Sequence, residues 1–500
     1  MPPNVALDSA VLRAVSGNEQ MVTPSGSFPA GSPTAAALGA SKNSHNVSFA
    51  RPAQHVPQGW SVSRTLVVVG AGPKALAIHT KAAALRAVGS DAPSVVIIED
   101  KGVAANWDGT NGYTDGRQQL VTPPEKDLGF PYRSGFGTRV DQTMVQYSWH
   151  AFLVATGRLS SRLHSQRPPV FHSDLASYLH WVSKESAADI RPGKVIDAGI
   201  ESNRNEWVVR YQPSDSTACQ ELRANGIVIT GPGSPRLLVG RTGRPHFIIS
   251  NSQTFWERRR IEDFRTFLKG RIAIVGAGDT AASVVVTLLD VLPNPEQVHI
   301  DLFCPIDREI GVTASRSESL GETGWHTNPT GWDRLALTAR KAYFKRTERG
   351  VFSGILKARI DAAANVRPIP AFVVDWERRE KAVKVTIESN GRREHFPGPY
   401  YNRLVVATGF KRWSFSELFR EKSEFPPSFP AIHVKGAKFD NEVEEAISMR
   451  IKTDLSYTND RGWPSAKLYL PILAGLQCGP GFPNLGCLGL LSDRIIGSVL

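Results

Sequence analysis

Residues Leu66–Ala75 read LVVVGAGPKA, and residues Ile272–Ala281, far downstream, read IAIVGAGDTA. Each stretch is a short apolar run followed by Gly-x-Gly-x-x-Ala. A strand that ends in such a turn and opens a helix forms a pyrophosphate site, because the second glycine lets the backbone approach the phosphates and the helix N-terminus presents free N–H groups. One match is weak evidence, whereas two in the same context predict two bound dinucleotides. FAD together with a nicotinamide cofactor is the usual reason for that arrangement.

The two turns supply the first candidate cofactor-binding residues, which are Gly70, Gly72, Ala75, Gly276, Gly278 and Ala281. A further candidate is Glu99, at the end of the apolar strand expected at Ser94–Ile98. An acid at the end of the second strand of such a unit accepts hydrogen bonds from a ribose. An ordinary surface acid is the alternative interpretation of Glu99.

Composition restricts the class of protein. The chain has 500 residues, is 41% hydrophobic and carries a formal net charge of +12. Its Lys and Arg residues are scattered among acids, so we expect no nucleic-acid partner. The four cysteines form no Cys-x-x-Cys pair, which predicts thiols in a reducing cytoplasm. No apolar run approaches the roughly 20 residues that span a bilayer, so no membrane partner is expected.

Along the chain, strands alternate with helices, which predicts an α/β protein with two Rossmann-like dinucleotide-binding domains and a small substrate-binding lobe. Apolar strands at Gly226–Thr230 and Arg403–Gly409 each lead to a glycine turn and are typical of the return strand of such a domain. A stretch rich in Ser, Pro, Ala and Gly at the start predicts a disordered tail, in which a short helix at Val5–Val15 or a targeting role stays open. The predicted divisions are the tail at 1–60, the FAD-binding domain at 61–240 and 400–500, the NADPH-binding domain at 241–310 and 366–399, and the substrate lobe at 311–365.

Several longer stretches resemble the flavin-dependent N-hydroxylating monooxygenases of lysine and ornithine, and among these the mycobactin-type lysine N6-hydroxylases. The stretches, beyond the first glycine turn, are Pro124–Ser134 (PEKDLGFPYRS), Tyr147–Trp149, Val275–Ser283, Gly350–Ser353, Gly479–Leu485 and Leu490–Asp493. The resemblance implies that NADPH reduces FAD, that the reduced flavin and O2 form a C4a-hydroperoxide, and that its terminal oxygen passes to a neutral amine of an amino acid. It implies neither a protein nucleophile nor a catalytic metal. Relatives act in the biosynthesis of siderophores or of natural products with a nitrogen–nitrogen bond.

The resemblance also assigns roles to single residues. Lys126 falls where the family holds the substrate carboxylate, and a solvated surface lysine is the alternative. Ser492 falls where a serine approaches the amine and the flavin, and an N-cap of the last helix is the alternative. Trp107 matches an aromatic residue before the substrate loop, for which core packing is the simpler account. Further residues that the family motifs place near a cofactor are Leu491, Thr408 and Gly409.

For the nicotinamide cofactor, Arg308 follows the strand expected at Val298–Phe303 and is placed to meet a 2′-phosphate. Asp301, just before it, argues for NADH instead. NADPH is therefore an implication of the resemblance more than of these residues.

The candidate substrate residues depart from the family pattern. Thr323 or Glu322 stands where the family has an asparagine, and Glu348 stands in a motif whose asparagine contacts the amino-acid head group, where an acid suits an α-ammonium. Arg316 and Arg450 add positive charge that could hold the second carboxylate of a substrate such as aspartate. The alternative is that both arginines are solvent-exposed and the substrate is lysine. Because one changed loop is poor ground for a different substrate, we predict lysine or a close diamino acid, with aspartate, ornithine or a diamine as alternatives.

Other functions share the two-dinucleotide plan. A disulfide oxidoreductase needs a redox cysteine pair, which the sequence lacks. A non-enzymatic flavin-binding module would bind FAD without turnover, and a Baeyer–Villiger or sulfur-oxidising monooxygenase would not depend on an amine. Whether the protein forms a homo-oligomer stays open.

Overall fold

The computed structural model describes residues 64–500 except for 111–112, 166–167, 202–204, 237–247, 305–323, 349–350, 390–391, 420–436 and 459–465. The predicted tail at residues 1–60, with its short helix, lies outside the described residues.

The first glycine turn belongs to a seven-stranded sheet with the strand order β17-β6-β1-β2-β3-β4-β5. The sheet is parallel from β17 through β6, β1 and β2 to the start of β3. It continues with the antiparallel pairs β3–β4 and β4–β5. Leu66, Val67 and Val68 of β1 are fully buried, as expected for a parallel strand covered on both faces. The bounds are β1 (Thr65–Val69), β2 (Ser94–Glu99), β3 (Asp189–Glu201), β4 (Glu206–Pro213), β5 (Gln220–Ala224), β6 (Gly226–Ile229) and β17 (Lys467–Tyr469).

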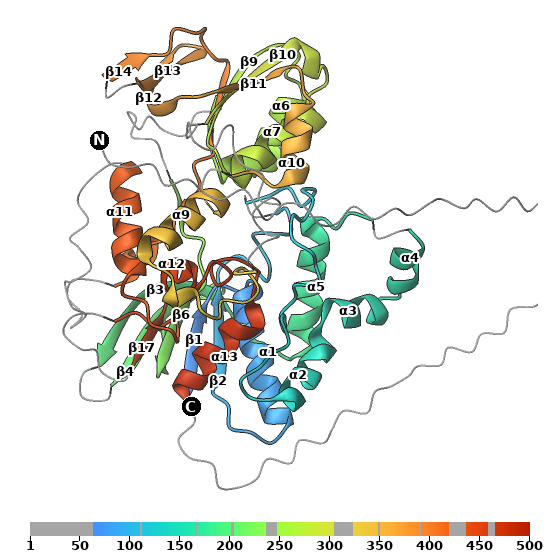
Figure 1. The fold of residues 1–500 in the computed structure, drawn as a ribbon, viewed down its shortest axis with the longest axis vertical. Coiled ribbons are helices and arrows are strands. Elements are labelled where there is room, and N and C mark those ends of the chain that lie inside the picture. The colour runs from blue at the N-terminus through green and yellow to red at the C-terminus, as the bar shows by residue number, and fades with distance from the viewer. Residues whose placement is uncertain are drawn as a thin grey trace, which may run out of the picture. The chain divides into compact units, whose positions relative to one another are not determined.

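Two helices from opposite ends of the described chain lie side by side against this sheet (Figure 1). They are α1 (Pro73–Ala87), which follows the first glycine turn, and α13 (Leu488–Val499), the last helix. The remaining helices of this part are α2 (Thr138–Met144), η1 (Val145–Tyr147), α3 (Trp149–Ala155), α4 (Leu159–His164) and α5 (His172–Glu185). Helix α3 ends shortly before Gly157, which takes a φ of +67°.

The second glycine turn belongs to a five-stranded parallel sheet with the order β11-β10-β9-β15-β8. Its strands are β8 (Ile249–Asn251), β9 (Gly270–Val275), β10 (Val298–Phe303), β11 (Val366–Ile369) and β15 (Arg403–Val406). The helices of this part are α6 (Arg258–Arg265), α7 (Asp279–Val291) and α10 (Gly354–Asp361). Figure 1 shows α6, α7 and α10 gathered beside this sheet.

Two predicted domain boundaries are wrong. Leu356 and Ile360 of α10 pack in the same hydrophobic core as Val285 and Leu288 of α7, so this helix belongs to the second sheet and not to the substrate lobe. Strand β15 pairs with β9, so the second sheet extends past residue 400. A short apolar strand fits either sheet by its composition, and only its pairing partner decides which sheet it joins.

Smaller elements complete the described chain. An antiparallel sheet of β12 (Phe372–Arg379), β13 (Ala382–Ser389) and β14 (Arg392–His395) lies between β11 and β15 in sequence, and β7 (Ser234–Pro235) pairs with β16 (Phe410–Lys411). The other helical elements are η2 (Thr254–Trp256), η3 (Pro295–Gln297), η4 (Trp332–Arg334), α9 (Leu337–Thr347), η5 (Ser414–Leu418), α11 (Ala437–Ser448), η6 (Pro471–Leu473) and α12 (Gly475–Cys478). Among the residues described, no helix combines the length and the apolar character needed to cross a membrane.

Candidate cofactor and substrate site

In the first glycine turn, neighbouring atoms fill the space beside the first glycine, whereas the space beside the second glycine is open. Gly70 has a φ of +99°, and a Cβ there would lie 2.6 Å from Oγ1 of Thr230, which follows β6. Among the described residues, no atom beyond its two chain neighbours lies within 4 Å of the Cβ position of Gly72. Gly72 also begins α1 without a side-chain cap, which leaves N–H groups of the first turn for an anion. The buried Ala75 lets the helix pack closely on the strand.

The second glycine turn repeats this geometry. Gly276 has a φ of +152°, and a Cβ there would overlap the carbonyl oxygen of Ala407, which follows β15. The space in front of Gly278 is open, and α7 begins without a side-chain cap. Oδ1 of Asp279 accepts a hydrogen bond from the N–H of Ser353 at 2.8 Å. That bond ties the Gly350–Ser353 stretch, which the sequence singled out, to the turn.

Glu99 lies against the first turn, at the carboxyl end of β2. Its Oε2 accepts a hydrogen bond from the N–H of Ala71 at 2.7 Å, and its Oε1 accepts one from the N–H of Lys101 at 2.8 Å. The pKa of this carboxyl is raised, because the effect of burial is larger than the opposing effect of the two backbone N–H groups. The position is the one expected for a ribose-binding acid, and the contact with a ribose stays a prediction.

Asp301 does not face the second nucleotide site. Its carboxylate accepts two hydrogen bonds from Arg367, each 2.8 Å long, and one from the hydroxyl of Tyr401 at 2.7 Å. The side chain is 2% exposed, so these partners occupy it inside the sheet. The argument from Asp301 for NADH is therefore wrong. Arg308, the predicted 2′-phosphate partner, lies outside the described residues.

Thr408 and Gly409 lie where the chain leaves the second sheet. The N–H of Arg236 donates to the carbonyl of Gly409 at 2.9 Å, beside the β7–β16 ladder. Gly409 has a φ of +85°, and no described atom beyond its chain neighbours lies within 4 Å of its Cβ position, which leaves room for a ligand there. Trp107 instead has a protein partner, because its ring meets the ring of His172 edge-on at 4.9 Å. Packing thus accounts for Trp107 without a cofactor contact.

Lys126 lies on a loop that a buried carboxylate holds in place. The neighbouring Asp127 accepts hydrogen bonds from the N–H of Trp149 at 2.9 Å and from the hydroxyl of Tyr132 at 2.8 Å. Burial raises the pKa of Asp127 to about 6, against the effect of these donors. The half-buried ammonium of Lys126 has no hydrogen bond or ion pair with any described residue, and burial lowers its pKa.

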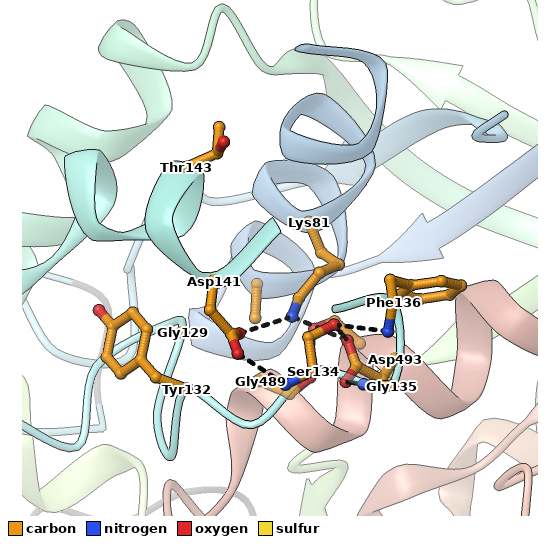
Figure 2. A network of polar contacts seen from close by, with 12 residues as sticks. Lys81, Gly129, Tyr132, Ser134, Gly135, Phe136, Asp141, Thr143, Gly489 and Asp493 are labelled. Atoms are coloured by element: carbon orange, nitrogen blue, oxygen red, sulfur yellow. Dashed lines mark hydrogen bonds and ion pairs between the residues drawn. The ribbon is translucent and has the colours of Figure 1, made fainter. Parts of the chain in front are cut away.

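A polar network joins helix α1 to two stretches that the sequence singled out (Figure 2). The ammonium of Lys81, on α1, is 2.8 Å from Oδ1 of Asp493 and 4.0 Å from Oδ1 of Asp141. Neither ion pair has the geometry of a hydrogen bond. Asp493 also accepts hydrogen bonds from the hydroxyl of Ser134 and the N–H of Gly135, each 2.9 Å long. The N–H of Ser134 donates to Asp141 at 2.9 Å. The network therefore connects α1, the Pro124–Ser134 stretch and α13.

The two neighbouring candidates on α13 face inward. Ser492 is fully buried, and its hydroxyl donates to the carbonyl of Gly489 in the same helix at 2.8 Å. Leu491 is fully buried as well. The alternative role of Ser492 as an N-cap is wrong, because Cys487 is the N-cap of α13. A side chain without exposed surface offers nothing to a ligand, so the structure gives no support to side-chain contacts from either residue.

Glu348 ends α9 and is held by a histidine. Its Oε1 lies 2.5 Å from Nε2 of His326, and the hydroxyl of Tyr343 lies 3.1 Å from Nδ1 of the same ring. The carbonyl of His326 fits against Gly481 and Gly486, where a Cβ would overlap its oxygen. The glycine-rich Gly479–Leu485 stretch, with Gly486 directly after it, thus lets the backbone of His326 approach, and the histidine ring in turn orients the carboxylate of Glu348.

Of the remaining substrate candidates, Thr323 and Arg316 lie outside the described residues. Arg450 is half-buried in the turn after α11. The preceding carbonyl, of Met449, accepts a hydrogen bond from Gln477 at 3.2 Å, and Gln477 in turn accepts one from Arg340 of α9 at 2.6 Å. Arg450 thus lies near the elements that carry Glu348, and its contact with a substrate stays a prediction.

A glycine turn directly after a parallel strand in each of two sheets defines an oxidoreductase that binds two dinucleotides. The sequence profile of the family described as L-lysine 6-monooxygenase/L-ornithine 5-monooxygenase matches residues 124–412, and the chain belongs to this family. A relative, the L-lysine N6-monooxygenase MbtG of Mycobacterium sp. (strain MCS), is 34% identical over 445 residues, which cover 88% of this chain and 96% of the relative. MbtG of Mycobacterium tuberculosis is 33% identical over 439 residues, covering 87% and 94%.

Solved structures agree with this assignment. The lysine monooxygenase NbtG from Nocardia farcinica superposes with a TM-score of 0.69 at 30% identity, covering 87% of this chain and 99% of NbtG. The ornithine N-hydroxylase KtzI from Kutzneria sp. 744 has a TM-score of 0.64 at 17% identity, covering 88% and 99%, and shows likeness of fold. The chain is thus an NADPH-dependent flavin N-hydroxylating monooxygenase that uses FAD.

The residues present fit both cofactors. Each turn keeps open space in front of its second glycine and an uncapped helix start, which a pyrophosphate needs. In the first turn Glu99 also lies at the ribose position. FAD would therefore be held at Gly70, Gly72 and α1, and NADPH at Gly276, Gly278 and α7.

Sequence reasoning missed Lys81, Asp127 and His326. A signal existed for Lys81, because most of the residues around it on α1 are small or apolar, and a lysine in such surroundings needs a partner. Asp127 stood beside Lys126 in the matched stretch but was given no role. Nothing in the sequence indicates that His326 meets Glu348, because that contact depends on how a loop folds over the glycine-rich segment.

Proposed function

We propose that this protein hydroxylates the side-chain amine of L-lysine at N6, using FAD, NADPH and O2, in the biosynthesis of a siderophore. The observation that carries the proposal is the half-buried ammonium of Lys126, which has no ion pair among the described residues and lies on a loop held by Asp127. An unpaired cation in such a place is suited to a substrate carboxylate. Relatives at 33–34% identity that are named L-lysine N6-monooxygenases support lysine as the amino acid.

The two ends of the lysine head group have separate partners in this proposal. Lys126 receives the α-carboxylate. Glu348 receives the α-ammonium, and its orientation is set by the 2.5 Å contact with His326. Held at its head, an extended lysine presents only its side-chain amine to the flavin.

FAD held at the first turn would, once reduced by NADPH, activate O2, of which one atom would pass to the amine and the other would leave as water. The residues of the chain then have to keep water out and the amine neutral. Burial disfavours the charged form of an amine. Removal of water from the site thus favours the free base, which is the form that accepts oxygen.

The proposal is tested by following NADPH oxidation and hydroxylamine formation with lysine, ornithine, aspartate, putrescine and cadaverine on the FAD-loaded protein. Hydroxylamine from lysine above all others supports it. Product from aspartate would assign Arg316 or Arg450 to a second carboxylate and overturn the choice of substrate. Hydroxylamine from none, with flavin bound, would favour a flavin-binding module without amine turnover.

Two further properties belong to the proposal. We expect a cytoplasmic enzyme, because the four cysteines are free. A homo-oligomer is an open possibility that light scattering of the purified holoenzyme decides.

A further inference from the structure

Lys74 is a buried lysine whose ammonium has no anionic partner among the described residues. It is the second residue of α1, directly beyond the first glycine turn, and 8% of its surface is exposed. Its ammonium forms no hydrogen bond or ion pair with any residue that the structure describes. The groups that interact with its charge are Cys487, the N-cap of α13, and Arg412.

The surroundings of Lys74 do not neutralise it. Arg412 is itself a cation and donates to Glu444 at 3.0 Å, and Glu444 is also bound by Arg236 at 2.6 Å. The thiol of Cys487 is neutral, because burial raises its pKa to about 12. The other cations that interact with Cys487 are Lys126 and Arg494. The cluster is therefore positive, with its acid already shared by two arginines.

An ammonium in this position is costly to keep charged. Burial lowers the pKa of Lys74 to about 8, so the charged form still predominates at pH 7. Buried charges in native proteins are normally paired with an opposite charge or bind a ligand. The missing partner of Lys74 is thus best sought in a ligand that enters the fold at this place.

The strand order indicates which part of FAD reaches Lys74. Glu99 ends β2 and the glycine turn ends β1, while β6 and β17 lie on the other side of β1. A dinucleotide with its ribose at Glu99 and its pyrophosphate at α1 continues over the ends of β6 and β17. Arg412, a neighbour of Lys74, donates to the carbonyl of Ile472 just beyond β17 at 3.4 Å. Lys74 therefore lies toward the flavin end of the cofactor.

We propose that the ammonium of Lys74 lies at the pyrimidine edge of the flavin ring and makes the bound FAD easier to reduce. The inference rests on the proposed use of FAD in the first site. Hydride transfer from NADPH brings two electrons and one hydrogen to N5 of the ring, and leaves a negative charge on the N1–C2 carbonyl edge unless a second proton is taken up. A cation at that edge binds the reduced ring more tightly than the oxidised ring.

The test compares Lys74→Met and Lys74→Gln, which remove the charge, with Lys74→Arg, which keeps it. Lys184→Met, an exposed lysine on α5, controls for the loss of one charge. The readouts are the two-electron reduction potential of the bound FAD at pH 7, measured against a reference dye, and the KM for lysine. We expect both neutral variants to lose at least tenfold of the preference for reduced over oxidised FAD, which lowers the potential by about 30 mV. Lys74→Arg and Lys184→Met should stay close to wild type.

An unchanged potential in FAD-loaded Lys74→Met and Lys74→Gln would overturn the proposal. A raised KM for lysine at unchanged potential would do so too, and would place Lys74 at the substrate carboxylate. If both neutral variants failed to fold while Lys74→Arg folded, the charge would have a protein partner and the proposal would fail. The reduction potential is measured without an amine. It therefore tests the role of Lys74 whether or not lysine is the substrate.

Discussion

Replacing Asp493 by asparagine removes the carboxylate nearest to the buried ammonium of Lys81. The two groups are 2.8 Å apart, and the lysine side chain is 1% exposed. In Asp493→Asn the next acid, Asp141, is 4.0 Å away, so Lys81 keeps a charge with weak compensation. Breaking a buried pair in this way costs about 3–5 kcal/mol of the free energy of unfolding. The amide also cannot accept both hydrogen bonds that Asp493 receives from Ser134 and Gly135.

Lys81→Met is the matched variant on the other side of the pair. Asp493 keeps its two donors and some exposure there, and methionine occupies the space of the lysine stem. We therefore expect a smaller loss, about 1–3 kcal/mol. In the double variant Lys81→Met/Asp493→Asn no unpaired charge remains, so its loss should fall short of the sum of the single losses by about 1–3 kcal/mol.

Urea unfolding of the FAD-loaded chain, followed by tryptophan fluorescence, measures these losses. Hydrogen exchange then locates them in α1 and α13, because a protein with two sheets need not unfold in one transition. Asp290→Asn breaks the exposed pair with Arg359 and should cost less than about 1 kcal/mol. Additive losses in the double variant, or a loss in Asp493→Asn no larger than in Asp290→Asn, would refute the reasoning from a buried pair.

Gly72→Val should abolish FAD binding, whereas Gly278→Val should stay yellow and lose reduction by NADPH; a colourless Gly278→Val would contradict the assignment of the turns. Lys126→Ala should raise the KM for lysine about 10- to 100-fold with little change in kcat, since one charged contact is worth about 1.5–3 kcal/mol, and the KM for cadaverine, which lacks a carboxylate, should not change. Glu348→Gln should raise the KM for lysine about 10-fold by the same reasoning and leave that for 6-aminohexanoate, which lacks the α-ammonium, unaltered. Asp127 binds its proton more tightly in the folded state than in the unfolded state, because burial raises its pKa to about 6. Its contribution to the free energy of unfolding is therefore complete below about pH 4 and is lost as the pH rises through 6. Unfolding curves between pH 4 and 7 should show this loss in the wild type and not in Asp127→Asn.

The parts of this protein that depend on local chemistry could be predicted from the amino-acid sequence. A buried apolar strand, two glycines and a small residue specify a dinucleotide turn, because the φ of Gly70 and the open space at Gly72 depend on a few neighbouring residues. The second dinucleotide turn could be predicted from the same sequence pattern. The sequence also located the Lys126 loop, because the stretch around it is long and unusual.

Contacts between residues that are distant along the chain became visible only in the folded structure. The sequence alone does not show that Asp301 is occupied by Arg367 and Tyr401, that β15 pairs with β9, or that Ser492 faces inward. The partnership of Lys81 with Asp493 joins residues that are far apart along the chain. Such contacts depend on the packing of whole helices and sheets, and a residue's charge or polarity does not reveal which partner the fold brings to it.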